Sequence, residues 1–160
     1  KIQHTKTNRV TAVNKIYLNK KITDITGTQL GLKPLMSLHS RIIAVRDVDA
    51  GETVGYSGLW TSPNATKIGV IAIGYGDGYP RYAKNGTPVL INGILVPLVG
   101  RVSMDMITVD LGLHSTAQAG DNVTLWGDGL PIEKIAHYSD TIPYTLVCGV
   151  TPRVDILEST

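Results

Sequence analysis

The sequence predicts a mainly β fold, an antiparallel β-barrel or sandwich with one or two short C-terminal helices. Three observations lead to this prediction. Short apolar runs follow one another from residue 34 to residue 127, with Gly, Pro and Asn between them, a spacing typical of all-β folds. The dipeptide Asn92-Gly93 separates two of these runs and is a strong hairpin signal. A helical pattern of apolar residues appears only after residue 130.

Composition narrows the class of protein. The chain has 160 residues, of which 42% are hydrophobic and 18% charged, values that suit one soluble domain with a real core. The sequence contains no run of eighteen apolar residues and no h-region with a small-residue cleavage site, so neither a transmembrane helix, nor a signal peptide, nor a membrane partner is expected. A net charge of +2 does not favour nucleic acid. Cys148 is the single cysteine, which excludes an internal disulfide and suggests the cytoplasm.

The first residues differ from the rest. Residues 1–22 are polar and basic, and their isolated apolar residues keep neither a helical nor a strand period. We therefore assign residues 1–26 to a basic leader of uncertain order and residues 27–160 to the β-domain. One short strand is predicted near residues 15–18, and residues 1–22 are expected to pack weakly or to extend away from the body.

The predicted elements follow in order. Strands are expected over residues 35–48, 53–60, 67–75, 88–91, 94–99, 101–111 and 122–126, where β-branched residues lie between turn signals. The run 67–75 is almost continuously apolar, as in a strand covered on both faces. A helix is predicted over residues 131–137, because Ile132, Ile135 and Ala136 have helical spacing behind a proline. A second short helix is predicted over residues 143–148.

A cluster of alternating glycines, Gly74-Tyr75-Gly76-Asp77-Gly78, interrupts this pattern. Glycine is poor strand filler, so the cluster indicates a backbone kept bare for something to approach. The alternative is a turn in which the aspartate hydrogen-bonds its own backbone. The spacing is not that of either standard phosphate loop. His39 and His137 lack partners at metal-ligand spacing, so no metal site is predicted.

Tyrosine is the main candidate for chemistry, with seven residues against no phenylalanine. Tyr56, Tyr75 and Tyr144 lie beside glycine or at a predicted helix start. A phenol there donates a hydrogen bond, or takes a proton where positive charge lowers its pKa. The alternative is an ordinary strand tyrosine with its ring in the core. Asp77 and Asp105 are either paired carboxylates or turn formers.

Five segments together resemble the C-terminal β-domain of the alanine racemase family. They are LKPLMSL (residues 32–38), GETVGYSGLW (51–60), IGYGDGYPR (73–81), VGRVSMDM (99–106) and GDNVTLWG (120–127). The resemblance covers residues 27–157 in order. It implies a pyridoxal-phosphate enzyme that interconverts L- and D-alanine and supplies D-alanine for peptidoglycan. It also implies a homodimer, in which a barrel lysine holds the cofactor and a tyrosine of the other subunit works on the opposite face.

The resemblance also implies roles for particular residues. Tyr56 matches the catalytic tyrosine, and Tyr144 matches the tyrosine that contacts the cofactor phosphate. Tyr75 matches the second active-site tyrosine. Met104 matches the residue whose backbone N–H helps hold the substrate carboxylate, with Asp105 beside it shaping the site. Racemisation needs an acid and a base on opposite faces of one carbon, and the cofactor supplies the electron sink.

The 160 residues do not resemble the N-terminal α/β barrel, so the cofactor lysine is expected outside this chain. The chain alone is therefore expected to be inactive, and the face with Tyr56, Tyr75 and Met104 is expected to be exposed. Two functions stay open at this point. One is the substrate-facing part of an alanine racemase, with alanine and serine both as possible substrates. The other is a stand-alone β-domain that associates or binds a small ligand.

Overall fold

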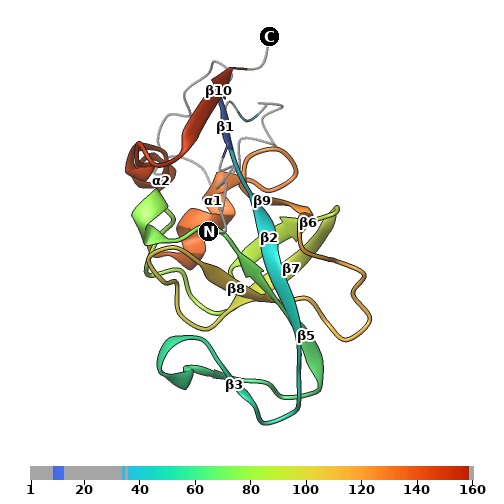
Figure 1. The fold of residues 1–160 in the computed structure, drawn as a ribbon. Helices are drawn as coiled ribbons and strands as arrows, with labels where there is room; N and C mark the ends of the chain where they lie inside the picture. Colours follow the sequence, from blue (N-terminus) through green and yellow to red (C-terminus); the bar gives the residue numbers. More distant parts are fainter. Residues whose placement is uncertain (1–8, 13–33, 35, 159–160) are drawn as a thin grey trace, which may run out of the picture.

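In the computed structural model, which describes residues 9–12, 34 and 36–158, six antiparallel strands close into a barrel (Figure 1). The barrel order is β2 (Met36–Val48), β5 (Thr66–Ile71), β8 (Ile107–Asp110), β7 (Ile94–Val99), β6 (Pro88–Ile91) and β9 (Asn122–Trp126). β9 pairs again with β2, which closes the ring. The predicted antiparallel barrel is confirmed.

β2 is the strand that organises the fold. Along its length β2 pairs first with β1 and then with β5, and it also pairs with β9. Irregularities in register occur at Leu38/His39 and at Ile42/Ala44, and such bulges bend a strand. Inward-facing apolar side chains fill the barrel, among them Leu38, Leu98 and Trp126, all fully buried.

The N-terminal residues differ from the expectation of a weakly packed leader. β1 (Arg9–Ala12) pairs antiparallel with β2 and parallel with β10 (Asp155–Glu158). Backbone hydrogen bonding therefore joins this part of the leader to the domain. The strand expected near residues 15–18 lies outside the described residues. β10 was not predicted, because its two apolar residues, Ile156 and Leu157, are adjacent and do not alternate with polar ones. All four of its side chains are exposed.

The prediction of one strand over residues 53–60 is wrong. The segment forms β3 (Thr53–Val54), the 3-10 helix η2 (Tyr56–Gly58) and β4 (Trp60–Thr61). Gly55 and Ser57 have φ values of 84° and 64°, which a continuous strand does not allow. Val54 is buried in a second small apolar cluster, with Val48, Ile68 and Val99, so the β3–β4 hairpin is anchored to the barrel.

The strands predicted over 67–75 and 101–111 are too long. β5 ends at Ile71 and β8 begins at Ile107. Residues 72–75 and 101–106, which were expected to extend these strands, form turns instead. The hairpin at Asn92-Gly93 is confirmed, and both residues have positive φ values (49° and 80°), as a type I′ turn requires.

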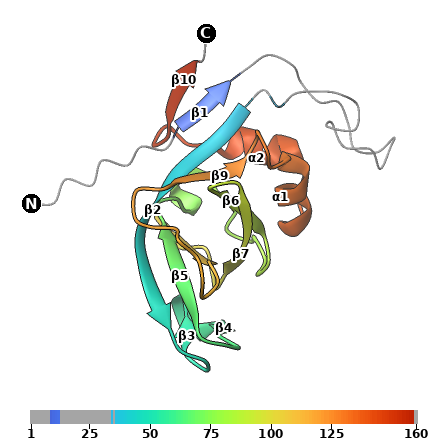
Figure 2. The ribbon, with the colours of Figure 1, turned by 90° about the vertical axis from the view of Figure 1, so that its right-hand side faces the viewer.

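Two short helices follow β9, as predicted. α1 (Ile132–Tyr138) buries Ile135 and Ala136, and α2 (Pro143–Gly149) buries Leu146. Both helices lie on the same side of the barrel and contact each other (Figure 2). The chain after α2 therefore returns to the turn that follows β5 and to the turn that precedes β8.

Candidate functional site

Two turns face each other where β5 and β8 end their pairing. The first contains the 3-10 helix η3 (Tyr75–Asp77), and the second covers residues 103–106. The Tyr75 N–H donates to the Ser103 carbonyl at 3.0 Å, and the Gly76 N–H donates to the Met104 carbonyl at 2.9 Å. The backbones of the two turns therefore lie in direct contact.

This contact explains the alternating glycines. A Cβ atom on Gly74 would lie 2.3 Å from the Ser103 carbonyl oxygen and 2.4 Å from that of Met104. A Cβ on Gly78 would lie 2.2 Å from the Gly149 carbonyl oxygen. Gly74 and Gly78 thus lack side chains because other segments of the same chain contact their backbone. From the sequence alone, a ligand could equally have occupied this space. The Gly74 N–H also donates to Oδ2 of Asp77 at 3.0 Å, as the turn alternative predicts.

Arg153 joins the two aspartates of these turns. Its Nε lies 3.2 Å from Oδ1 of Asp77, and its Nη2 lies 2.5 Å from Oδ1 of Asp105. The hydrogen bond that the guanidinium donates to Asp105, together with the charge of Asp77, raises the pKa of Arg153. The two carboxylates therefore meet at a shared cation, which is a different arrangement from a dyad that shares one proton. No sequence pattern marked Arg153.

Tyr75 and Met104 present their side chains at the surface beside this contact, with exposed fractions of 41% and 52%. The Arg81 guanidinium lies 5.7 Å from the centroid of the Tyr75 ring, within the range of a cation–π interaction. The Met104 N–H donates no hydrogen bond within the part of the chain that the structure describes. This face therefore offers a cation, a phenol and a backbone donor.

The backbone just before Tyr56 lies against residues 100 and 101, which precede the second turn; the side chain of Tyr56 is outside the described part of the structure. Tyr56 begins η2, directly after Gly55. A Cβ on Gly55 would lie 3.3 Å from the Cα of Gly100 and 3.4 Å from the N of Arg101. The structure thus places η2 beside the segment that leads into Met104.

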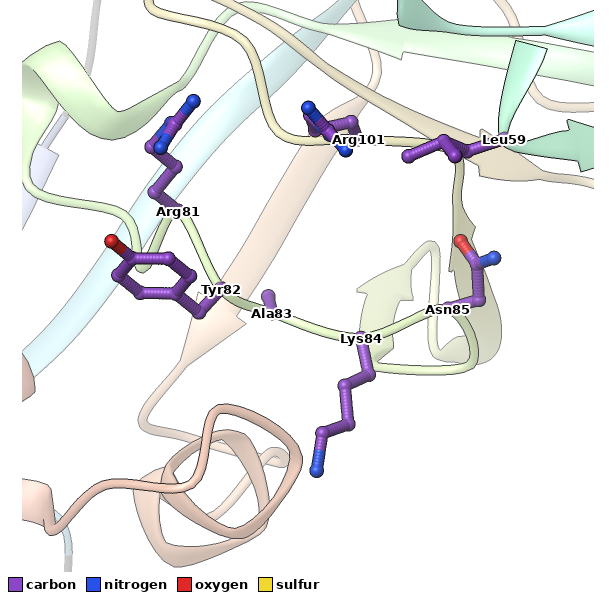
Figure 3. A pocket seen from close by; sticks show the side chains of 8 residues that line it. Leu59, Arg81, Tyr82, Ala83, Lys84, Asn85 and Arg101 are labelled. Atoms are coloured by element: carbon purple, nitrogen blue, oxygen red, sulfur yellow. The ribbon is translucent and has the colours of Figure 1, made fainter. Parts of the chain in front are cut away.

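A hollow of about 380 Å³ opens between the loop after Tyr79 on one side and Leu59, Gly100 and Arg101 on the other (Figure 3). Figure 3 shows Arg81 and Arg101 on one side of it, with Lys84 directed away to an ion pair with Asp140 at 2.5 Å. Both arginines lie in segments that resemble the family, residues 73–81 and 99–106. The sequence analysis assigned neither of them a role. The remaining lining residues are Leu59, Tyr82, Ala83, Asn85 and Gly100.

Tyr144 lies in the first turn of α2, directly after Pro143, and its side chain is 38% exposed. Its hydroxyl has no hydrogen-bond partner among the described residues. The opposite end of α2 packs on Gly78, so this helix is attached to the first turn. The structure thereby connects Tyr144 to the site through the helix, while Tyr75, Met104 and Asp105 are brought together directly.

Residues 9–12, 34 and 36–158 offer neither a metal site nor a helix of membrane-spanning character. No group of three or more His, Cys, Asp or Glu side chains in these ranges is placed to hold a metal ion. No helix in the same ranges has the length and apolar character needed to cross a membrane.

Known proteins resemble the chain over most of its length. The family model "Alanine racemase, C-terminal domain" matches residues 35–157. The alanine racemase of Vibrio parahaemolyticus is 57% identical over 134 residues, which cover 84% of this chain and 37% of that protein. The crystal structure of biosynthetic alanine racemase from Pseudomonas aeruginosa superposes with a TM-score of 0.84 at 46% identity, covering 86% of this chain and 38% of that one.

A further solved structure has a ligand. The alanine racemase of Bartonella henselae, with covalently bound pyridoxal phosphate, superposes with a TM-score of 0.76 at 34% identity, covering 80% of this chain and 36% of that one. The chain therefore spans between a third and two fifths of the length of these relatives. It belongs to the alanine racemase family, and it corresponds to the C-terminal domain of that family.

Proposed function

We propose that this chain is the substrate-facing C-terminal domain of an alanine racemase, a cytoplasmic enzyme that interconverts L- and D-alanine and supplies D-alanine for peptidoglycan. The observation that carries the proposal is the match over residues 35–157 together with the exposed face of Tyr75 and Met104. An identity of 57% to an alanine racemase makes a stand-alone binding role the weaker alternative.

The residues of this face fit the substrate. Alanine carries a carboxylate, and the unpaired Met104 N–H supplies a donor that points to no protein acceptor among the described residues. The cation of Arg81 beside Tyr75 favours an anionic ligand nearby. Asp105 is paired with Arg153. The guanidinium compensates the negative charge of Asp105, which would otherwise repel the substrate carboxylate proposed to bind at Met104.

The cofactor proposed is pyridoxal phosphate, which supplies an electron sink for the electrons of the broken Cα–H bond. The exposed Tyr144 hydroxyl, without a partner in the described residues, fits a contact to its phosphate. Tyr56 is proposed to take the α-proton from L-alanine or to return one. The lysine that holds the cofactor and the face opposite Tyr56 belong, in this proposal, to the N-terminal barrel of a homodimer.

Reconstitution tests this function. The chain is mixed with a separately expressed N-terminal barrel of the family and with pyridoxal phosphate, and D-alanine formed from L-alanine is measured. We expect D-alanine from the mixture and none from either part alone. Turnover by the barrel alone, or none from a mixture in which both parts are folded and associated, would contradict the proposal. L-Serine in a parallel assay decides which substrate is preferred.

A further inference from the structure

Arg153 lies between two aspartates that come from different turns of the site. Asp77 is fully buried, whereas the side chains of Arg153 and Asp105 are 38% and 49% exposed. Desolvation of a carboxylate is costly, so a buried one needs a positively charged partner. Asp77 therefore fixes the guanidinium in place, and the guanidinium in turn holds Asp105 at 2.5 Å.

The segment that carries Arg153 is itself attached to the first turn. The Thr151 hydroxyl donates to the Gly76 carbonyl at 2.8 Å, and the Thr151 N–H donates to the Asp77 carbonyl at 3.2 Å. Residues 151–153 thus bind the first turn through the hydroxyl and the N–H of Thr151 and reach the second turn through the Arg153 guanidinium. The Arg153 side chain packs closely on the first turn, because a Cβ on Gly76 would lie 2.2 Å from Nη1 of Arg153.

We propose that Arg153 is a positioning residue, which sets the distance between the turn with Tyr75 and the turn with Met104 by bridging Asp77 and Asp105. The planar guanidinium donates a hydrogen bond to Asp105 through Nη2 and forms an ion pair with Asp77 through Nε, and the single ammonium of lysine does not reproduce this pair of contacts. The bridge itself is a structural inference, whereas its effect on substrate binding rests on the proposed function. The bridge keeps the Met104 N–H in place for the substrate carboxylate and compensates the negative charge of Asp105.

Amide hydrogen exchange tests the bridge in the 160-residue chain without any activity. The reporters are the Tyr75 and Gly76 amides, which donate across the two turns. In Arg153→Gln we expect these amides to exchange about tenfold faster or more, as for a lost charge-assisted hydrogen bond. Arg153→Lys is expected to be intermediate. The Leu98 amide, which donates to Thr87 within the barrel, is expected to keep its rate.

Arg41→Gln is the matched control, because this arginine donates to the Gly120 carbonyl and touches neither aspartate. It is expected to leave the Tyr75 and Gly76 amides unchanged. The inference is overturned if Arg153→Gln leaves these two amides at the wild-type rate. It is also overturned if they accelerate only by the same factor as Leu98, since that result indicates a global loss of stability.

Arg153→Gln leaves the buried charge of Asp77 without the Arg153 guanidinium, and this could prevent folding. A second variant addresses that case. The double variant D77N/R153Q removes the bridge and the buried charge together, while the asparagine amide introduced at the first position retains an oxygen to accept the Gly74 N–H. We expect this chain to fold and its Tyr75 and Gly76 amides to exchange faster. Wild-type exchange in the double variant would overturn the inference.

Kinetics of the reconstituted racemase provide the second readout. Arg153→Gln is expected to raise the KM for alanine about tenfold and to change kcat less, because the groups that move the proton are retained. Equal losses in kcat and in kcat/KM, with no change in KM, would overturn the inference. If wild-type chain and barrel give no racemisation, the proposed function fails, while amide exchange still decides whether Arg153 positions the turns.

Discussion

The ring of Tyr79 stacks on the ring of Trp126 in the barrel core, with centroids 6.2 Å apart and planes inclined by 13°. Both side chains are almost completely buried. Neither the Tyr79 hydroxyl nor Nε1 of Trp126 has a hydrogen-bond partner among the described residues, and burial raises the pKa of Tyr79. The pair thus stabilises the core by apolar contact, while two polar atoms remain unsatisfied.

Tyr79→Phe is therefore expected to increase the free energy of unfolding by about 1 kcal/mol, because it removes an unsatisfied hydroxyl and keeps the ring. Urea denaturation of both chains measures the difference. Tyr79→Leu is the control, with an expected loss of about 2–4 kcal/mol from the missing ring volume. A loss of stability in Tyr79→Phe would show that the hydroxyl has a partner, such as an ordered water.

The barrel was predictable from the sequence because its signals are local. Alternating β-branched residues and the Asn92-Gly93 turn specify strands and a hairpin without reference to distant residues. The site was only partly predictable, because its contacts join residues far apart in the chain. Arg153 meets Asp77 and Asp105 across 76 and 48 positions, and a single arginine in a polar segment gives no local sign of this. The same limit applies to β1, whose strand pairing depends on β2 and β10.

Gly74→Ala is expected to separate the two turns of the site. The new Cβ would lie 2.3–2.4 Å from two backbone carbonyl oxygens, which do not move aside as the end of a flexible side chain does. We expect a loss of about 3 kcal/mol in the free energy of unfolding. Gly149→Ala is the matched control, since its Cβ would meet only Gly78 O at 3.6 Å. Its expected change is within about 1 kcal/mol. Equal effects of the two substitutions would contradict this account.

His39 is expected to make stability depend on pH. Desolvation by burial lowers its pKa, against the opposing effects of the Asp128 charge and a backbone hydrogen bond with Val123. Below the unfolded-state pKa, about 6.5, the unfolded chain binds more protons than the folded chain. The contribution of His39 is thus intact above that pH and is lost as the pH falls below it.

The measurement compares urea denaturation of wild type and His39→Asn at several pH values. The asparagine amide retains a group that can bond the Thr124 hydroxyl, which lies 3.2 Å from Nδ1 of His39. We expect the loss of stability between pH 7.5 and 5.5 to be smaller in the variant. The two chains should have parallel profiles between pH 7.5 and 9, where His39 does not titrate. Identical slopes in the acidic range would contradict the assignment to His39.

Tyr144→Phe is expected to weaken retention of pyridoxal phosphate in the reconstituted racemase. The substitution removes one hydrogen bond to the phosphate, which corresponds to about 1 kcal/mol, or about fivefold in affinity. Cofactor absorbance after dialysis measures the loss. Tyr138→Phe, at the end of α1, is the control and is expected to retain cofactor as the wild type does. Equal retention in Tyr144→Phe would exclude Tyr144 from the phosphate site.

Tyr56→Phe tests the chemistry assigned to this domain. Phenylalanine keeps the ring and removes the hydroxyl, which is the group proposed to handle the proton on this face. General acid–base groups contribute about 10²–10⁴-fold, so we expect a loss of that size in kcat for the conversion of L-alanine to D-alanine by the reconstituted racemase. Tyr138→Phe again serves as the control and is expected to keep the wild-type rate. If Tyr56→Phe retained full turnover, another group would move the proton, and the role proposed for Tyr56 would be wrong.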